Sequence, residues 1–291
     1  MNAKSLLNNL KQNPIFGVIS YDQIIFDTLK SSPTMYESPE PKILILCGPP
    51  GSGKSTIKTQ LLVSKNISDY VNIDPDEIRS ILMDQGLTFP DDKTMSGITN
   101  AFNKRIRNES QKQRFNIVFD TTGQNFRAVF DLIRNSRDSG YKTHFVIVYA
   151  SLETCLARVN SRNARLAETA SSRIPLPIEV AKSIYKGFLQ DKGTASLFLL
   201  EYPVRVDEIL LYDNNTYGME PKLLYQKVQN EVIASSNFPN FYNMMLRENA
   251  PHIIKKSSGG KTKKIRRKKF KKTRRRKKIE MIYTENNIFK Y

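Results

Sequence analysis

The sequence predicts an α/β fold, in which a parallel sheet of about five strands carries helices on both faces and a basic tail follows. Short β-rich runs alternate with longer amphipathic stretches from Lys42 onward, which is typical of strands joined by helical crossovers. Most of these runs are apolar almost throughout, as expected for strands covered on both faces. The first run also leads directly into a glycine-rich turn that opens a helical stretch.

The composition excludes several classes of protein. The chain has 291 residues, of which 39% are hydrophobic, so it can bury a core and is not disordered as a whole. Its two cysteines, Cys47 and Cys155, cannot build a disulfide framework and fit a reducing, intracellular compartment. No apolar run reaches about 18 residues, so no membrane span is expected. Residues 1–11 lack the apolar segment of a secretory signal.

The net charge of +18 is concentrated in one segment. Residues 255–278 contain 16 Lys and Arg and no Asp or Glu, which leaves 30 basic against 28 acidic residues elsewhere. Because so many like charges repel one another, this tail is expected to be disordered. Nuclear import, nucleic-acid attachment, an anionic membrane surface and simple solubilisation are all open roles for it. A cytoplasmic or nuclear location follows, and the tail resembles those of nuclear proteins and of proteins of large DNA viruses.

The expected elements follow in chain order. Apolar positions at helical spacing predict two short helices within residues 1–30, and three prolines in residues 31–41 predict a linker. Strands are expected at 42–48, 70–74, 115–120, 142–150 and 208–213. Helices are expected at 54–64, 94–112, 125–139, 152–166, 178–190 and 220–235. The chain thus divides into a helical extension with a linker (1–40), one α/β domain (41–236), a linker (237–254) and the tail (255–291).

The strongest motif lies between the first strand and the helix after it. It matches G-x-x-x-x-G-K-[ST] and consists of Gly48, Pro49, Pro50, Gly51, Ser52, Gly53, Lys54, Ser55 and Thr56. Glycines allow positive φ and close backbone approach, so successive N–H groups and the helix N-terminus can hold phosphate oxygens. Lys54 is expected to neutralise the β- and γ-phosphates of ATP, and the Ser55 hydroxyl to bind Mg²⁺. The fold is therefore expected to be that of a P-loop NTPase or kinase.

Acidic residues follow the second strand, and they have two explanations. Asp74 is a good N-cap, Pro75 suits the first helical position, and Asp76 and Glu77 favour the positive end of a helix. The carboxyl ends of parallel strands also face the ligand, so a carboxylate here could orient and deprotonate a hydroxyl that accepts the phosphate. Asp76 is the candidate for this catalytic and substrate-binding role, and Asp74 is the runner-up.

The third strand ends in Asp120, followed by Thr121, Thr122, Gly123 and Gln124. An acid at the end of a buried strand beside the phosphate loop can help to hold Mg²⁺. Thr122 and Gln124 would line the acceptor side together with Asp120. A plain strand end followed by a turn and a helix cap is the alternative.

Arginines follow the fourth strand. Arg158, Arg162 and Arg165 recur at helical spacing and share one helix face, and Arg173 comes after them. Guanidinium groups suit the charge that spreads over a transferring phosphoryl group, and Arg162 and Arg173 are the favoured catalytic candidates. A solvated basic helix face is the alternative.

Together these residues resemble the zeta-toxin family of P-loop kinases over about residues 42–213. The resemblance rests on the sequences GPPGSGKST, IDPD and DTTG, on the arginine helix, and on the arginine before a proline-rich turn. It implies transfer of the γ-phosphate of ATP, with Mg²⁺, to a hydroxyl of a sugar nucleotide such as UDP-N-acetylglucosamine. It also implies that Asp76 is the general base, Lys54 the phosphate lysine, and Arg162 and Arg173 the lid arginines. The family usually has Glu at the position of Asp120 and Arg at the position of Gln124.

Two other functions are compatible with the same motifs. A 5′-hydroxyl polynucleotide kinase would use the same carboxylate, and the tail would supply affinity for the nucleic acid. A non-catalytic module gated by nucleotide would only deliver the tail to nucleic acid. The acceptor, any antitoxin-like partner and the oligomeric state are not predicted.

Overall fold

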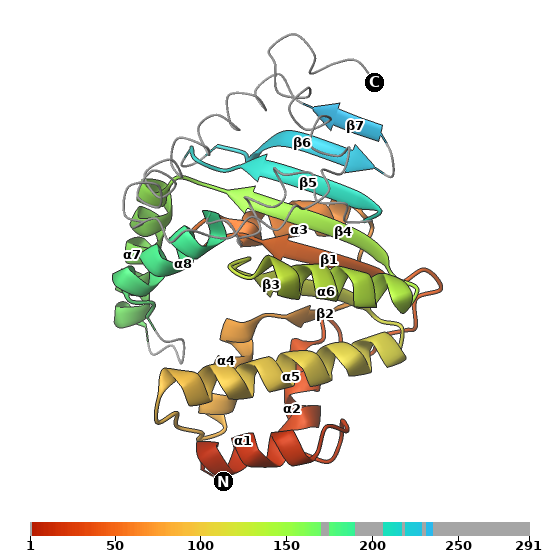
Figure 1. The fold of residues 1–291 in the computed structure, drawn as a ribbon, viewed down its shortest axis with the longest axis vertical. Coiled ribbons are helices and arrows are strands. Elements are labelled where there is room, and N and C mark those ends of the chain that lie inside the picture. Colours follow the sequence, from red (N-terminus) through yellow and green to blue (C-terminus); the bar gives the residue numbers. More distant parts are fainter. Residues whose placement is uncertain (1, 170–174, 190–205, 217–218, 229–230, 235–291) are drawn as a thin grey trace, which may run out of the picture. The chain divides into compact units, whose positions relative to one another are not determined.

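The computed structural model describes residues 2–169, 175–189, 206–216, 219–228 and 231–234, so the expected linker and tail beyond residue 236 lie outside it. Its strands form a single sheet (Figure 1). The helices are α1 (Ala3–Gln12), α2 (Tyr21–Leu29), α3 (Lys54–Ser64), α4 (Pro75–Asp84), α5 (Asp92–Lys112), α6 (Phe126–Asp138), α7 (Leu152–Glu168) and α8 (Ile178–Leu189). The strands are β1 (Lys42–Cys47), β2 (Tyr70–Ile73), β3 (Asn116–Thr121), β4 (Lys142–Tyr149), β5 (Glu208–Asp213), β6 (Lys222–Val228) and β7 (Glu231–Ala234).

The sheet confirms the predicted parallel core. Its order is β2-β3-β1-β4-β5-β6-β7, and every pairing from β2 to β5 is parallel. The segments after β1, β2, β3, β4 and β5 therefore leave the sheet at one edge, which is the carboxyl edge where ligands bind in such folds.

The helix predicted at 220–235 is wrong, because this stretch forms the antiparallel strands β6 and β7. Its apolar residues fit a helical face over a short window, but the parallel strand β5 leaves an unpaired edge that β6 covers. Glu208 of β5 lies opposite Val228, and Gln226 donates a hydrogen bond of 2.9 Å to the Glu208 carboxylate. Pairing with a neighbour thus overrides local periodicity.

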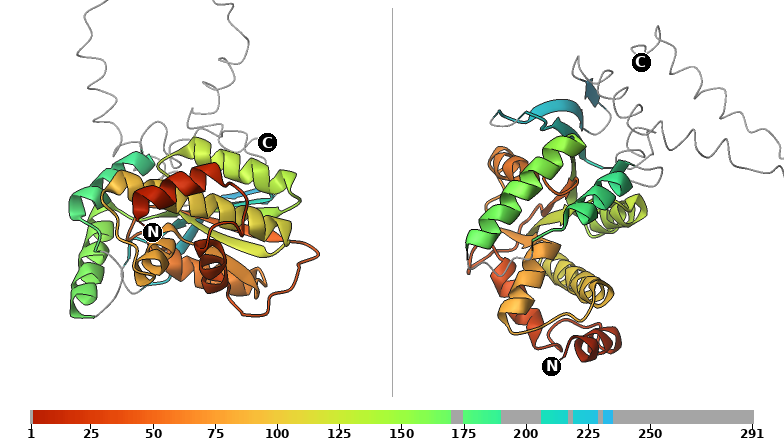
Figure 2. Two further views of the ribbon diagram at one scale, coloured as in Figure 1. Left: turned by 90° about the horizontal axis from the view of Figure 1, so that it is seen from below. Right: turned by 90° about the vertical axis from the view of Figure 1, so that its left-hand side faces the viewer.

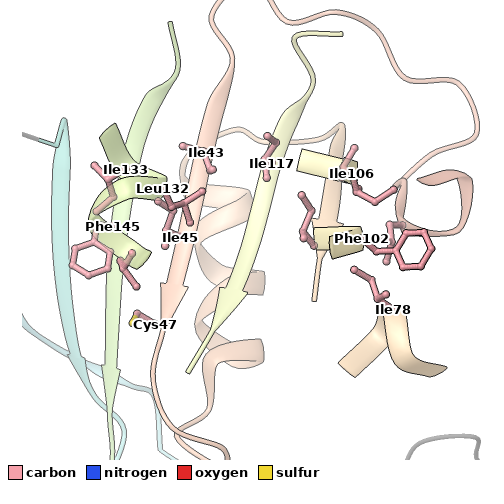
Figure 3. Close-up of a cluster of buried hydrophobic side chains, with 14 of the residues drawn as sticks. Ile43, Ile45, Cys47, Ile78, Phe102, Ile106, Ile117, Leu132, Ile133 and Phe145 are labelled. Atoms are coloured by element: carbon pink, nitrogen blue, oxygen red, sulfur yellow. The ribbon is translucent and has the colours of Figure 1, made fainter. Parts of the chain in front are cut away.

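Alternate residues of the central strand point into two apolar layers. Ile43, Ile45 and Cys47 of β1 face the larger layer, which α4, α5 and α6 cover (Figure 3). Leu44 and Leu46 face the opposite layer, where Ile57 and Leu61 of α3 pack. The helices thus cover both faces of the sheet, as predicted.

The two N-terminal helices are present as predicted, and they share the larger core layer. Leu6, Ile25 and Phe26 belong to it and are at most 1% exposed. Arg105 of α5 forms an ion pair with Asp22, and both side chains are buried. The same guanidinium donates to the carbonyl oxygens of Asn13 and Ile15, so it fixes the segment between α1 and α2 to α5.

Candidate active site

The glycine-rich loop between β1 and α3 depends on its glycines. Gly51 has φ of +79° and Gly53 has φ of +91°, in the left-handed region that other residues rarely adopt. A Cβ atom on Gly48 would lie 2.5 Å from the carbonyl oxygen of Val148. Gly53 is also the N-cap of α3, so the loop opens onto the N-terminus of that helix, the arrangement that binds phosphate.

Lys54 connects this loop to the end of β3. Its Nζ donates a hydrogen bond of 2.8 Å to the carbonyl oxygen of Gly48 and lies 3.5 Å from Oδ1 of Asp120. In the sheet register Leu46 lies opposite Asp120, so the two parallel strands bring the lysine and the acid together. The predicted phosphate lysine and the predicted metal carboxylate are therefore neighbours.

The environment of Asp120 favours its protonated form. The pKa of its carboxyl is raised to about 6: burial raises it most, the carboxylates of Asp74 and Asp76 add to the increase, and Lys54 opposes it. The acids after β2 are thus close enough to act electrostatically on the acid at the end of β3. Since a divalent cation would relieve this repulsion, the acidic cluster suits Mg²⁺ bound through one carboxylate together with the Ser55 hydroxyl and phosphate oxygens.

Replacing Asp120 by asparagine is expected to stabilise the protein by about 1–3 kcal/mol at pH 7.5. The folded-state pKa of about 6 lies above 3.8, the ordinary value for an aspartate, so the folded protein binds an extra proton between these pH values. The unfavourable contribution of the carboxylate therefore appears as the pH rises from about 4 and is complete above about 6. Urea unfolding of the wild type and Asp120→Asn at pH 4 and 7.5 measures it, with exposed Asp138→Asn as the control. If Asp120→Asn changes the free energy of unfolding equally at both pH values, the raised pKa of Asp120 is contradicted.

Asp74 and Asp76, the two candidates in this segment, have different surroundings. Asp74 is the N-cap of α4, and its Oδ1 accepts a hydrogen bond of 2.8 Å from the backbone N–H of Asp76. The side chain of Glu77 accepts a bond of 2.6 Å from Asn72 of β2, so it is held against the sheet. Asp76 keeps 58% of its side chain exposed and forms an ion pair with Arg79, one turn further along α4. It is therefore the most accessible of the three carboxylates.

The turn after β3 brings the expected acceptor residues next to α8. The Thr122 hydroxyl lies 3.5 Å from Oε1 of Gln124. The Gln124 side chain packs against Gly187 of α8, where a Cβ atom would lie 3.0 Å from Nε2 of the glutamine. The neutral amide that occupies this position thus contacts a second helix.

The three arginines of α7 have different surroundings. Arg158 donates a hydrogen bond of 3.2 Å to the carbonyl oxygen of Gly51, so it contacts the glycine-rich loop directly. The Nε atom of Arg162 is buried and has no hydrogen-bond partner in the described part of the chain. Arg165 is exposed and bonds to its own helix, and Arg173 lies outside the described residues. Arg158 is therefore the arginine of α7 that contacts the loop. Helical spacing predicted the face on which it lies, but Arg162 and Arg173 were the favoured catalytic candidates.

Asn214, after β5, contacts the same loop and was missed in the sequence. It is 6% exposed, and its Nδ2 donates a hydrogen bond of 2.8 Å to the carbonyl oxygen of Ser52. The neighbouring Asn215 accepts a hydrogen bond from the backbone N–H of Ser151, at the start of α7. The sequence does contain a signal for this residue, because Asn214 directly follows a predicted parallel strand, as Gly48 and Asp74 do.

Replacing Asn214 by alanine is expected to weaken ATP binding about tenfold and to destabilise the fold by about 1–3 kcal/mol. The change leaves the buried carbonyl group of Ser52 without its partner and removes the side chain that packs on Gly53. Isothermal titration with a non-hydrolysable ATP analogue and thermal unfolding measure the two effects. The exposed residue Asn160 provides the control, Asn160→Ala. Unchanged affinity in Asn214→Ala would show that the loop does not need this support.

Comparison with known proteins agrees with this architecture. The family model described as zeta toxin matches residues 27–217. A complex of AvrRxo1-ORF1 and AvrRxo1-ORF2 with ATP contains a chain of 15% identity, with a TM-score of 0.55, coverage of 84% of this chain and 70% of that one. A chain of the PezAT toxin–antitoxin system of Streptococcus pneumoniae is 12% identical, with a TM-score of 0.50 and coverage of 89% and 99%.

No curated protein matches the sequence significantly. Among the described residues, no helix is long and apolar enough to cross a membrane. The match to the family model spans more than half of the chain, and the two structural neighbours share its sheet and helices. The protein therefore belongs to the zeta-toxin family and has a P-loop kinase fold.

Proposed function

We propose that the protein is an ATP- and Mg²⁺-dependent kinase that transfers the γ-phosphate of ATP to a hydroxyl group of a small molecule. The observation that carries this proposal is the meeting of three strand ends. Lys54 lies 3.5 Å from Asp120, and the carboxylates of Asp74 and Asp76 act on the pKa of Asp120. Phosphoryl transfer needs little more from a protein than cations around the phosphate and a carboxylate near the attacking hydroxyl.

The cations have distinct tasks in this proposal. Lys54 neutralises the β- and γ-phosphates, which the backbone N–H groups of residues 48–56 hold. Ser55 and Asp120 would hold Mg²⁺, which supplies charge neutralisation of the phosphate oxygens. Arg158 adds a guanidinium at Gly51, and Arg162 and Arg173 remain the proposed arginines for the charge of the transferring group. The ATP-bound AvrRxo1 complex supports the choice of nucleotide.

Asp76 is the proposed general base. Its carboxylate is exposed and forms an ion pair with Arg79, and in this proposal it accepts the proton of the acceptor hydroxyl. Because both residues lie in the first turns of α4, the acceptor hydroxyl would displace or bridge this pair when it approaches the γ-phosphate. Asp120, Thr122 and Gln124 line the acceptor side.

A sugar nucleotide of the UDP-N-acetylglucosamine type is the acceptor that family membership favours. The experiment supplies the purified full chain with labelled ATP, Mg²⁺ and either this compound or a small-molecule cell extract, and it follows transfer of the label. Lys54→Ala is the control, because it removes the cation proposed to neutralise the phosphates. Label transfer that requires Lys54 supports a small-molecule kinase, and no transfer to any acceptor contradicts it.

A second candidate is a 5′-hydroxyl polynucleotide kinase, favoured by the 16 Lys and Arg of residues 255–278. Cations in this number would bind a polyanion with steep salt dependence. Deleting residues 255–291 should then lower activity on an oligonucleotide at low salt but leave activity on a mononucleoside unchanged. ATP binding without turnover, combined with tail-dependent binding of DNA, would instead indicate a non-catalytic module.

A further inference from the structure

Asn72 of β2 connects the helix that follows the phosphate loop with the helix that carries Asp76. Its Oδ1 accepts a hydrogen bond of 3.4 Å from Nζ of Lys58 on α3, and its Nδ2 donates a bond of 2.6 Å to the Glu77 carboxylate on α4. A lysine only donates and a carboxylate only accepts, so an amide is the neutral group that can bond both at once. The Asn72 side chain therefore links α3 to α4 through the sheet.

The sheet places Asn72 on the face that α3 covers. Asn72 lies opposite Val118 of β3 in the register, and Val118 belongs to the apolar layer on which α3 packs. Asp120, two residues after Val118, points to the same face because side chains alternate along a strand. α3 lies on this face, and α5 and α6 lie on the other (Figure 2). Lys54 and Lys58, one helical turn apart, thus reach two neighbouring strands, at Asp120 and at Asn72.

Glu77 departs from the usual role of an acid at its position. It is the third residue of α4, where an acid commonly bonds back to the backbone N–H of the N-cap and forms a capping box. Here Asp74 caps the helix through the backbone N–H of Asp76, and the Glu77 carboxylate bonds Asn72 of the sheet. The start of the helix is satisfied locally, so the bond from Asn72 fixes the position of the first turn against β2.

Asp76 has no comparable connection of its own. Its exposed carboxylate pairs with Arg79 of the same helix, and in the described part of the chain it bonds no group outside α4. The position of this carboxylate relative to the phosphate loop therefore depends on where the first turn of α4 lies. A misplacement of about 1 Å between reacting groups can cost a factor of about 100 in rate.

We infer that Asn72 is a positioning residue that holds the first turn of α4, and with it Asp76, in place beside the phosphate loop. The inference rests on the proposed kinase function and adds to it a residue that acts through Asp76. Lys58 provides the fixed end of the connection, because it belongs to the helix whose N-terminus faces the phosphate loop.

Reversing the polarity of the Asn72–Glu77 hydrogen bond tests this role. Asn72→Asp places two carboxylates together, whereas Asn72→Asp/Glu77→Gln lets an amide on α4 donate to a carboxylate on β2 and keeps the net charge. Glu77→Gln alone retains an oxygen that accepts from Asn72, so the change at position 72 is the disruptive one. Asn135→Asp adds the same charge at an exposed position of α6 and is the control.

Three measurements are made on each full-length protein. Titration gives the affinity for a non-hydrolysable ATP analogue, single-turnover transfer of labelled phosphate gives the rate, and hydrogen exchange reports on the amides of α4. We expect Asn72→Asp to bind the analogue as the wild type does but to transfer phosphate at least about tenfold more slowly. Its α4 amides should exchange faster, because the first turn is no longer held to the sheet.

The double variant should recover most of the transfer rate and of the protection from exchange, which a simple loss of packing at position 72 would not do. Asn135→Asp should behave as the wild type in all three measurements. If Asn72→Asp does not fold, Asn72→Ala, which adds no charge, takes its place with the same expected loss of rate and of protection.

Equal transfer rates in the wild type and the variant at position 72, or a double variant as slow as Asn72→Asp, overturn the inference. A parallel loss of affinity for the ATP analogue also overturns it and assigns Asn72 to nucleotide binding. If the wild type transfers phosphate to no acceptor, the proposed function fails and hydrogen exchange alone decides the hold on α4. Unchanged exchange of the α4 amides in Asn72→Asp then contradicts it.

Discussion

Asp76→Asn is expected to slow phosphoryl transfer by about 10²- to 10⁴-fold, while the affinity for ATP stays unchanged. Asparagine is similar in shape but cannot accept the proton of the attacking hydroxyl at neutral pH. The N-cap of α4 is provided by Asp74, so the helix retains its first turn in the variant. Single-turnover transfer of labelled phosphate to the acceptor found in the screen measures the rate of the chemical step.

Glu77→Gln is the matched control for this change. It removes one negative charge from the next residue, whose carboxylate bonds Asn72 of β2 instead of facing the acceptor. We expect it to retain most of the transfer rate. Equal rates in the wild type and Asp76→Asn would remove Asp76 from the chemistry, and equal losses in both variants would indicate a general effect of charge near Asp120.

Arg105→Met is expected to destabilise the whole domain by about 3–5 kcal/mol, because it leaves the Asp22 carboxylate buried without its counter-ion. The backbone N–H groups of Gly17 and Ile19 still donate to that carboxylate, but they carry no full charge. Urea unfolding followed by circular dichroism measures the loss.

The double variant Asp22→Asn/Arg105→Met tests whether the loss comes from the unpaired charge. We expect it to be more stable than the sum of the two single changes predicts, since the cost of the orphaned carboxylate disappears. A single cooperative transition would show that α1 and α2 fold with the sheet. If α1 and α2 unfold at a lower urea concentration while the rest of the domain keeps its stability, they form a separate extension.

Local patterns in the sequence were sufficient to predict the parallel strands at the core of the fold. The five strands from 42 to 213 are confirmed because buried parallel strands are apolar throughout and the glycine-rich turn identifies the first of them. The meeting of Lys54 and Asp120 also follows from one rule, that carboxyl ends of parallel strands share an edge.

The remaining features depend on tertiary contacts that periodicity does not encode. Residues 222–228 and 231–234 form strands because β5 presents an unpaired edge, although the apolar spacing of this part of the sequence also fits a helix. Helical spacing placed three arginines on one face of α7, but only the position of that helix over Gly51 selects Arg158.

A crystal structure of the full chain with Mg²⁺ and a non-hydrolysable ATP analogue tests the central claim most directly. We expect the triphosphate in the loop of residues 48–56, Lys54 on its β- and γ-oxygens and the metal between Ser55 and Asp120. The Asp76 carboxylate should face the γ-phosphorus, close enough for one hydroxyl group to bridge them. A γ-phosphate out of reach of Asp76, or an Asp76 turned to solvent away from the metal, would contradict the account and leave nucleotide binding as the only supported activity.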